Sequence, residues 1–330
     1  MKRARLQWHA YALPLREPIM VRGQSLIRRE GVLVRADVPA GAVGWGDAAP
    51  LPGFSAETLS QVFRELAALE AGMCEPAVCS SSVRFAVESA RADAEAAACG
   101  TSLGEFLLGR TAGSCAVNAL IAGAPADWSH EAARCAAEGF EVAKVKVGRE
   151  AWQSEAQALR DAARAAPSLR WRLDANRAWS ADDALAFARA IAGLPVDYIE
   201  EPFRDGATIS ASWPAEVGIA WDESLQGDGA IPDPHRSVTA FVIKPTLCGG
   251  LARSLELVKT AHTRGLVPVF SSAYESGVGV RILAELGAAC GSVSGLDPYR
   301  ALGADVLRPP LSIAAGALDL AAARRSEVNA

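Results

Sequence analysis

The sequence predicts an α/β protein in which a closed barrel of parallel strands follows a smaller α+β unit. Two observations predict this fold. From about residue 116 onward, strand-like runs alternate with helical stretches, and parallel neighbouring strands need such crossovers. Before residue 113 the strand-like runs instead come close together, separated by turn glycines at Gly31, Gly41 and Gly44, as is typical of an antiparallel sheet.

The N-terminal unit is predicted from three strand-like runs and two alanine-rich amphipathic stretches. A loop at 49–55, stiffened by Pro50 and Pro52, follows the last strand, and Ser55 is the expected N-cap of the first helix. The expected strands cover residues 3–11, 31–38 and 42–47, and the expected helices cover 55–71 and 82–99.

The barrel is predicted from eight strand-like runs, the number in a (β/α)8 barrel. A doubly wound open sheet is the alternative, and it is disfavoured because no strand is followed by a GxGxxG or GxxxxGK[ST] phosphate loop. The expected strands are 116–121, 142–147, 169–174, 196–200, 217–222, 239–244, 267–272 and 293–297. The expected helices are 129–138, 152–166, 180–192, 250–264 and 275–289.

Composition excludes several classes of function. Of the 330 residues 50% are hydrophobic and 22% are charged, which suits a large buried core. A net charge of −5 predicts neither nucleic acid nor an anionic membrane as partner. No apolar run approaches the roughly 20 residues that cross a bilayer. The 7 cysteines lack zinc-site spacing and the 4 histidines are scattered. We therefore expect a cytoplasmic protein with reduced thiols and no obligate protein partner evident.

Charged residues stand at the ends of five consecutive predicted strands. Lys144 and Lys146 share one face of the strand 142–147, because alternate residues of a strand point the same way. The next four strands end in Asp174, Glu200, Asp222 and Lys244. One such residue is most simply a solvated strand end. Five in register predict a common site, since catalytic groups of a barrel come from the C-terminal ends of its strands.

This set of side chains predicts metal-assisted proton transfer. Three carboxylates in a barrel mouth repel one another unless a cation lies between them. Oxygen ligands alone suit Mg²⁺ better than zinc. Lysines close to the metal can have a lowered pKa and remove a proton beside a substrate carboxylate, while the metal holds the enediolate oxygens. The expected partner is thus a small-molecule carboxylate substrate.

Seven motifs resemble the enolase superfamily, its muconate-cycloisomerase-like branch, and within it the o-succinylbenzoate synthase family of menaquinone biosynthesis. The resemblance spans roughly residues 45–297. It rests on PLPGFS (50–55), KVKVG (144–148), RLDANRAW (172–179), IEEP (199–202), IAWDESL (219–225), VIKPTL (242–247) and GLD (295–297).

The resemblance implies a fold and a division of the chain. The fold is a modified TIM barrel, (β/α)7β, with an N-terminal α+β capping domain. The capping domain would cover residues 1–113 and the barrel 114–310. Residues 311–330 would return to the capping domain.

The resemblance also implies roles and a reaction. Asp174, Glu200 and Asp222 would bind Mg²⁺, with Mn²⁺ able to substitute. Lys146 would be the acid/base, Lys144 would tune its pKa by like charge, and Lys244 would face the enediolate from the other side. The reaction would be syn-dehydration of 2-succinyl-6-hydroxy-2,4-cyclohexadiene-1-carboxylate to 2-succinylbenzoate.

Several further residues are expected to support this site. Phe54 would exclude water if its loop closes over the barrel mouth; the alternative is that the loop only links the two domains. Arg172 would lie beneath Asp174 and orient or neutralise the acids, and Asn176 follows in the same motif. Gly249 either offers exposed backbone after its strand or simply forms a turn. Ser271 and Ser272 end a strand, where they could bind substrate oxygens or simply form a turn.

Strand alternation aims Glu201 and Glu223 away from the metal. Where synthases have another serine and an aliphatic residue, this chain has Ala273 and Tyr274.

Two alternatives remain. Racemisation of N-succinylamino acids or epimerisation of dipeptides would use lysines on both faces of the substrate, which this chain has. A non-catalytic binding scaffold is the remote alternative, since it would not need all five charges.

Overall fold

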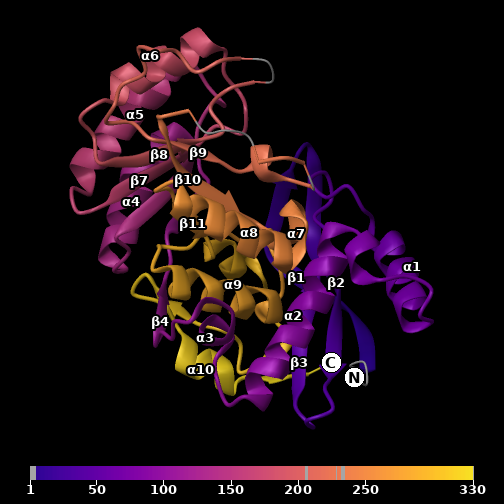
Figure 1. Cartoon of the computed structure of the whole chain (residues 1–330). Helices are drawn as coiled ribbons and strands as arrows, with labels where there is room; N and C mark the ends of the chain where they lie inside the picture. Colours follow the sequence, from indigo (N-terminus) through magenta and orange to yellow (C-terminus); the bar gives the residue numbers. More distant parts are fainter. Residues whose placement is uncertain (1–4, 205–206, 228, 232–234, 330) are drawn as a thin grey trace.

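The protein consists of an N-terminal antiparallel sheet and a parallel barrel sheet, each packed against helices (Figure 1). This computed structural model describes residues 5–204, 207–227, 229–231 and 235–329. In Figure 1 the N-terminal strands are indigo to violet, and the barrel strands run from magenta to orange. Among the described helices, none is long and apolar enough to cross a membrane.

The N-terminal sheet packs on two helices through the apolar face of its central strand. Val32, Val34 and Ala36 alternate along that strand and are completely buried. A Cβ atom at Gly46 would lie 1.9 Å from the backbone oxygen of Ala86, so strand and helix are in backbone contact there. The strands are β1 (Arg5–Val21), β2 (Gln24–Asp37) and β3 (Val43–Ala48), and the helices are α1 (Leu59–Glu70) and α2 (Ser81–Ala98).

The first two strands extend well beyond the predicted 3–11 and 31–38. They form one long hairpin that continues through residues 12–30, with an irregularity between Pro14 and Ile19. The prolines interrupt the apolar alternation that identifies a strand. They are tolerated because β1 lies at the edge of the sheet.

The first helix begins later than predicted. Thr58 is its N-cap, and its hydroxyl accepts a hydrogen bond from the Gln61 amide at 3.3 Å. The expected cap, Ser55, is wrong. Its hydroxyl accepts from the Leu51 amide at 2.8 Å and so closes the preceding loop instead. A short helix at α3 (Leu103–Leu108) was not predicted.

The seven barrel strands lie side by side in chain order, and every neighbouring pair is parallel, which confirms the predicted fold class. The strands are β5 (Ala119–Ile121), β6 (Val142–Lys146), β7 (Arg170–Asp174), β8 (Val196–Glu200), β9 (Ile219–Trp221), β10 (Val238–Ile243) and β11 (Val267–Phe270). The helices are α4 (Trp128–Ala137), α5 (Trp152–Ala165), α6 (Ala181–Ile191), α7 (Pro245–Cys248), α8 (Gly250–Thr263) and α9 (Gly277–Cys290).

Single backbone bridges close the barrel where an eighth strand was predicted at 293–297. Ser294 bridges to Val117 and Gly295 bridges to Ser271, both in parallel orientation. The Gly295 oxygen also accepts from the Ser272 amide at 2.9 Å. With one bridging residue toward each edge, this segment joins β5 to β11 without forming a regular strand.

The C-terminal segment packs on the start of the barrel. The predicted strand 116–121 is in fact two strands, because its first part pairs with the C-terminal segment instead of the barrel. The predicted division into 1–113, 114–310 and 311–330 stays a prediction. The remaining elements are β4 (Ser114–Ala116), β12 (Leu307–Arg308), β13 (Ile313–Ala314), β14 (Ala317–Asp319), α10 (Leu320–Arg325) and β15 (Glu327–Val328).

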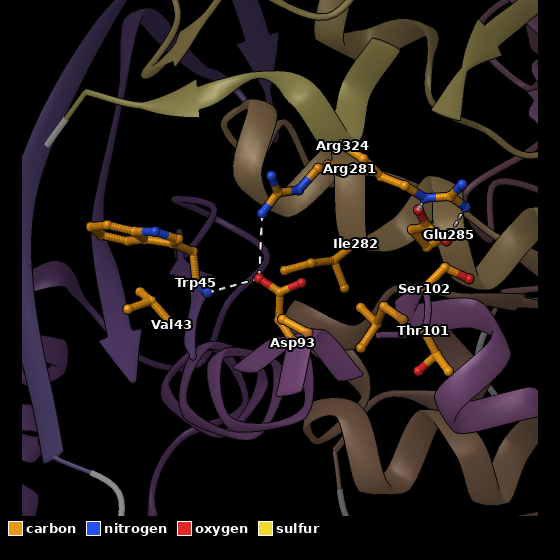
Figure 2. Close-up of a pocket in the computed structure, with 11 residues that line it drawn as sticks. Val43, Trp45, Asp93, Thr101, Ser102, Arg281, Ile282, Glu285 and Arg324 are labelled. Carbon is orange, nitrogen blue, oxygen red and sulfur yellow. Dashed lines mark hydrogen bonds and ion pairs between the residues drawn. The ribbon is translucent and has the colours of Figure 1, made fainter. Parts of the chain in front are cut away.

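Two ion pairs connect the elements around a cavity of about 290 Å³ between the N-terminal unit and the barrel (Figure 2). Asp93 on α2 accepts hydrogen bonds from the Trp45 amide at 3.0 Å and from Arg281 on α9 at 3.4 Å. Arg324 on α10 donates to both oxygens of Glu285 on α9, at 2.5 and 2.9 Å. Helix α9 is therefore held by the first and the last parts of the chain.

Candidate active site

Five charged side chains converge at the C-terminal rim of the barrel. Lys146 pairs in register with Asp174, and Asp174 pairs with Glu200, across β6, β7 and β8. Asp222 directly follows β9, and Lys244 directly follows β10. Parallel strands in register bring these ends to one rim, so the predicted grouping follows from the topology.

The amines and carboxylates form one continuous network. Lys144 Nζ lies 2.6 Å from Glu200 Oε2 and 2.9 Å from Asp174 Oδ2. Lys146 Nζ lies 2.6 Å from the same Asp174 oxygen. Lys244 Nζ contacts Asp222 Oδ2 and lies 3.8 Å from Glu200 Oε1. Lysines thus face the three acids from β6 on one side and from the end of β10 on the other.

The pKa of Asp174 is lowered, whereas the pKa values of Glu200 and Asp222 are raised. Burial raises the pKa of Asp174, but Lys144 and Lys146 outweigh it and hold this pKa well below its usual range. Burial, together with repulsion from Asp174, raises the pKa of Glu200 to about 7. Burial also raises the pKa of Asp222. The negative charges of the three carboxylates repel one another, as expected for three acids at one site.

Lys144 and Lys244 are strongly held in their charged form in this arrangement. Burial lowers the pKa of Lys144 and Lys244, but the neighbouring carboxylates outweigh it and raise both pKa values. This is opposite to the lowered pKa expected beside a metal. The difference has a physical cause, because the amines alone balance the acids here.

The acids fit a divalent cation. Their side chains are at most 1% exposed. Glu200 Oε1 and Asp222 Oδ1 are buried and have no hydrogen-bond partner. An unpartnered carboxylate oxygen in a buried site is costly, and a hard cation with oxygen ligands would satisfy both. As the side chains stand, no group of three or more His, Cys, Asp or Glu in the described ranges is arranged to hold a metal, and Lys144, Lys146 and Lys244 contact the three acids instead.

An asparagine connects one lysine to a further acid. Asn176 Oδ1 accepts from Lys146 Nζ at 2.8 Å, and Asn176 Nδ2 donates to Glu223 Oε1 at 3.1 Å. Burial raises the pKa of Glu223. Strand alternation did not place Glu223 near Lys146, because the chain leaves extended geometry after β9 and enters a 3-10 turn at Glu223–Leu225.

Arg172 is buried in the barrel as predicted, but its guanidinium binds groups other than the acids. It donates to the Val293 oxygen at 2.7 Å and to Asn118 and Asp197 at 3.2 Å. These bonds connect β7 to β8 and to residues 293–297, the segment that closes the barrel. Arg172 therefore braces the barrel interior beneath Asp174.

The two serines after β11 are already hydrogen-bonded. Ser271 Oγ donates to the Gly295 oxygen at 3.3 Å, and Ser272 Oγ donates to Glu275 Oε2 at 2.7 Å. Gly249 has a φ of +111° and joins α7 to α8, so its backbone conformation is one that favours glycine. A substrate role for these three residues stays a prediction.

An apolar cluster, here called the apolar cover, includes Leu247, which lies three residues after Lys244. Leu51 of the 49–55 loop packs with Leu247 and Ala273, and Phe54 and Tyr274 pack against this cluster. The buried Arg29 donates to the backbone oxygens of residues 49, 50 and 274, at 3.0 to 3.1 Å. The loop that carries Phe54 is therefore tied to the segment that follows β11.

Comparisons with known proteins agree with this geometry. Residues 127–323 match the family described as "Enolase C-terminal domain-like", and residues 1–94 match "MenC, N-terminal domain". In structure the chain resembles the L-Ala-D/L-Glu epimerase from Bacillus subtilis, with a TM-score of 0.80, 22% identity and coverage of 99% of this chain and 98% of that one. A dipeptide epimerase from Enterococcus faecalis gives a TM-score of 0.83 at 20% identity, covering 97% of each chain. The chain is therefore an enzyme of the enolase superfamily. This conclusion rests on its parallel barrel, on the charged residues at the barrel rim and on the family match.

Sequence relatives narrow the assignment. The o-succinylbenzoate synthase of Yersinia pseudotuberculosis is 36% identical over 311 residues, which cover 91% of this chain and 92% of the relative. That of Pectobacterium atrosepticum is 35% identical over 287 residues, 84% of each. That of Haemophilus influenzae is 32% identical over 292 residues, also 84% of each. The chain belongs to the o-succinylbenzoate synthase family.

Proposed function

We propose that this protein dehydrates 2-succinyl-6-hydroxy-2,4-cyclohexadiene-1-carboxylate to 2-succinylbenzoate in menaquinone biosynthesis. The single observation that carries the proposal is the placement of three buried acids between lysines of β6 and β10, in a chain whose relatives are o-succinylbenzoate synthases. This site suits removal of a proton beside a carboxylate followed by loss of hydroxide on the same face.

Asp174, Glu200 and Asp222 are the proposed ligands of a divalent cation. Their buried oxygens, two of them without a hydrogen-bond partner, support this role. A bound Mg²⁺ would supply positive charge that stabilises negative charge developing on the substrate carboxylate and lowers the pKa of the adjacent lysines.

Lys146 is the proposed acid/base. In its neutral form Nζ takes the proton from the carbon next to the substrate carboxylate, and the C–H electron pair moves into the carboxylate. When that pair returns to form the ring double bond, the C–O bond breaks and Nζ gives the same proton to the departing hydroxide, which leaves as water. Asn176 Oδ1, 2.8 Å away, fixes the position of Nζ.

Lys144 and Lys244 are proposed to act through charge. Lys144 Nζ bridges Asp174 and Glu200 and keeps these acids in place. Lys244 Nζ approaches from the end of β10, so it faces a substrate held between the lysines from the side opposite Lys146. The apolar cover with Leu51 and Phe54 excludes water from this reaction.

Kinetics with two substrate classes test the proposal. The ratio kcat/KM should be higher for the cyclohexadiene carboxylate than for N-succinylamino acids. If the amino acids are better by tenfold, equivalent to about 1.4 kcal/mol in transition-state stabilisation, the main function is racemisation. That alternative has support from the fold it shares with dipeptide epimerases and from the lysines on both sides of the acids.

The cytoplasmic location, substitution of Mg²⁺ by Mn²⁺ and the absence of an obligate protein partner stay predictions.

A further inference from the structure

One carboxylate ties together the turns that follow three barrel strands. Glu201 Oε1 accepts from the backbone amides of Asp222 at 2.9 Å and Ser224 at 2.7 Å. Its other oxygen accepts from Ser224 Oγ and Arg177 Nε, both at 3.0 Å. Arg177 also donates to Ser224 Oγ at 3.0 Å. These contacts therefore connect three segments with one another: those that follow β7, β8 and β9.

The backbone at these turns is in an unfavourable conformation. Asn176, Arg177 and Glu201 have φ values of +42°, +62° and +41°, a region that costs a non-glycine residue of order 1–3 kcal/mol. The Arg177 amide donates to the backbone oxygen of Glu201 at 2.7 Å and so joins two of these turns directly. Surrounding contacts must hold such a backbone in place, and the Glu201 carboxylate provides those to the Arg177 side chain and to the Asp222 and Ser224 amides.

The three acids of the rim are the immediate neighbours of these turns. Glu200 precedes Glu201, Asp174 precedes Asn176 by two residues, and the Asp222 amide is itself a donor to Glu201. The Glu201 side chain is only 6% exposed, whereas that of Arg177 is 31% exposed. The Glu201 carboxylate therefore holds the Asp222 backbone directly, and it reaches the segment that carries Asp174 through the Arg177 side chain.

We propose that Glu201 and Arg177 are positioning residues that hold Asp174, Glu200 and Asp222 at the separation a divalent cation requires. This inference rests on the metal site of the proposed function and adds residues that touch neither substrate nor metal. Glu201 supplies four acceptor contacts, and Arg177 fixes the direction of the carboxylate.

Magnesium titration calorimetry on the full chain without substrate tests the inference. In Glu201→Gln, an amide donor replaces one acceptor oxygen and faces other donors, so the Mg²⁺ dissociation constant should rise about tenfold or more. Arg177→Met should also weaken Mg²⁺ binding, and Arg177→Lys should recover part of the loss because it restores the charge but not the fork of donors. If Arg177 contributed only to folding, Arg177→Lys would not be expected to bind Mg²⁺ more tightly than Arg177→Met.

Arg170→Met is the matched control. Arg170 forms an ion pair with Asp197 at 2.7 Å across the same two strands, at their other end, so this variant should keep the Mg²⁺ dissociation constant within about twofold. If Glu201→Gln does not fold, as judged by its melting temperature, the two Arg177 variants decide. The inference is wrong if Arg177→Met is folded and binds Mg²⁺ as tightly as the unaltered chain.

The unaltered protein separates this inference from the proposed function. If it binds Mg²⁺ but does not dehydrate the cyclohexadiene carboxylate, the proposed function fails and the Mg²⁺ titrations still decide the role of Glu201. If it does not bind Mg²⁺, the positioning role is wrong as well.

Discussion

At the scale of residues, the site depends on which lysine moves the proton. Lys146 and Lys244 both contact a rim carboxylate, but they approach from strands on opposite sides of Glu200. A syn elimination needs only one base, because proton and hydroxide leave from the same face.

Exchanging each lysine for arginine should therefore have unequal effects. Arginine keeps the charge but does not readily act as a base, so Lys244→Arg should retain measurable activity and Lys146→Arg should not. Lys146→Ala should also abolish exchange of the substrate α-proton with solvent deuterium, followed by NMR. Activity in Lys146→Arg and none in Lys244→Arg would assign the base to Lys244.

Removal of the metal should abolish activity, and the loss should be reversible. EDTA treatment should inactivate the enzyme, and Mg²⁺ or Mn²⁺ should restore it. Full activity of metal-free protein would exclude the three acids as essential metal ligands.

Magnesium affinity should depend on pH. The pKa of Glu200 is raised to about 7, and a carboxylate must be ionised to bind the cation. Affinity should therefore fall as the pH drops below 7, by up to about tenfold per pH unit. Calorimetry in buffers from pH 6 to 8 would show this, and a flat profile would contradict it.

The residues of the site could be predicted where they end a barrel strand or directly follow one, as Asp222 and Lys244 do. Lys146, Asp174 and Glu200 end strands in register, so their convergence follows from strand–helix alternation. Alternation aimed Glu201 away from the metal but could not give its partners, among them Arg177, because the positive φ values of both residues take them out of extended geometry.

At the scale of elements, the contact between β3 and α2 depends on the absence of a side chain at Gly46. The Ala86 oxygen lies 1.9 Å from the position that a Cβ would take.

The elements differ in how well the sequence predicts them. The amphipathic barrel helices were predicted close to their observed ends, whereas residues 12–30 were not recognised because Pro14 and Pro18 mask the edge strand.

Gly46→Ala should destabilise the fold by about 3 kcal/mol, since a backbone clash cannot be relieved by rotating a side chain. Urea unfolding would measure the change. Gly113→Ala is the control, because a Cβ there meets nothing within 4 Å. Equal unfolding free energies for the two variants would mean that β3 can move away from α2 at little cost.

At the scale of the whole molecule, a buried carboxylate joins the N-terminal sheet to the barrel. Asp47 on β3 accepts from the Ser276 amide at 2.8 Å and hydroxyl at 2.7 Å, at the start of α9, and from the Tyr11 hydroxyl at 2.9 Å. Burial raises the pKa of Asp47 from 3.8 to about 6. Between these two values the folded chain holds a proton that the unfolded chain has released.

The contribution of Asp47 to stability should therefore be present below about pH 4 and be lost as the pH rises through 6. Relative to Asp47→Asn, which does not titrate, the unaltered protein should lose roughly 2–3 kcal/mol of unfolding free energy over this range. Urea unfolding from pH 4 to 7 measures the difference. Asp37→Asn on the neighbouring strand is the control, and parallel profiles for Asp47→Asn and the unaltered chain would refute the prediction.

The bridges at Ser294 and Gly295 have a consequence for biosynthesis. They join the first barrel strand to the last, and the nearby bond from the Leu120 amide to Asp297 spans 177 residues of sequence. A nascent chain on the ribosome therefore exposes β5 as an unpaired edge until nearly all of the protein has been translated. Such edges invite association between unfinished chains. Folding in the cell should therefore be completed late, and slowly, because the closing contacts are far apart in sequence.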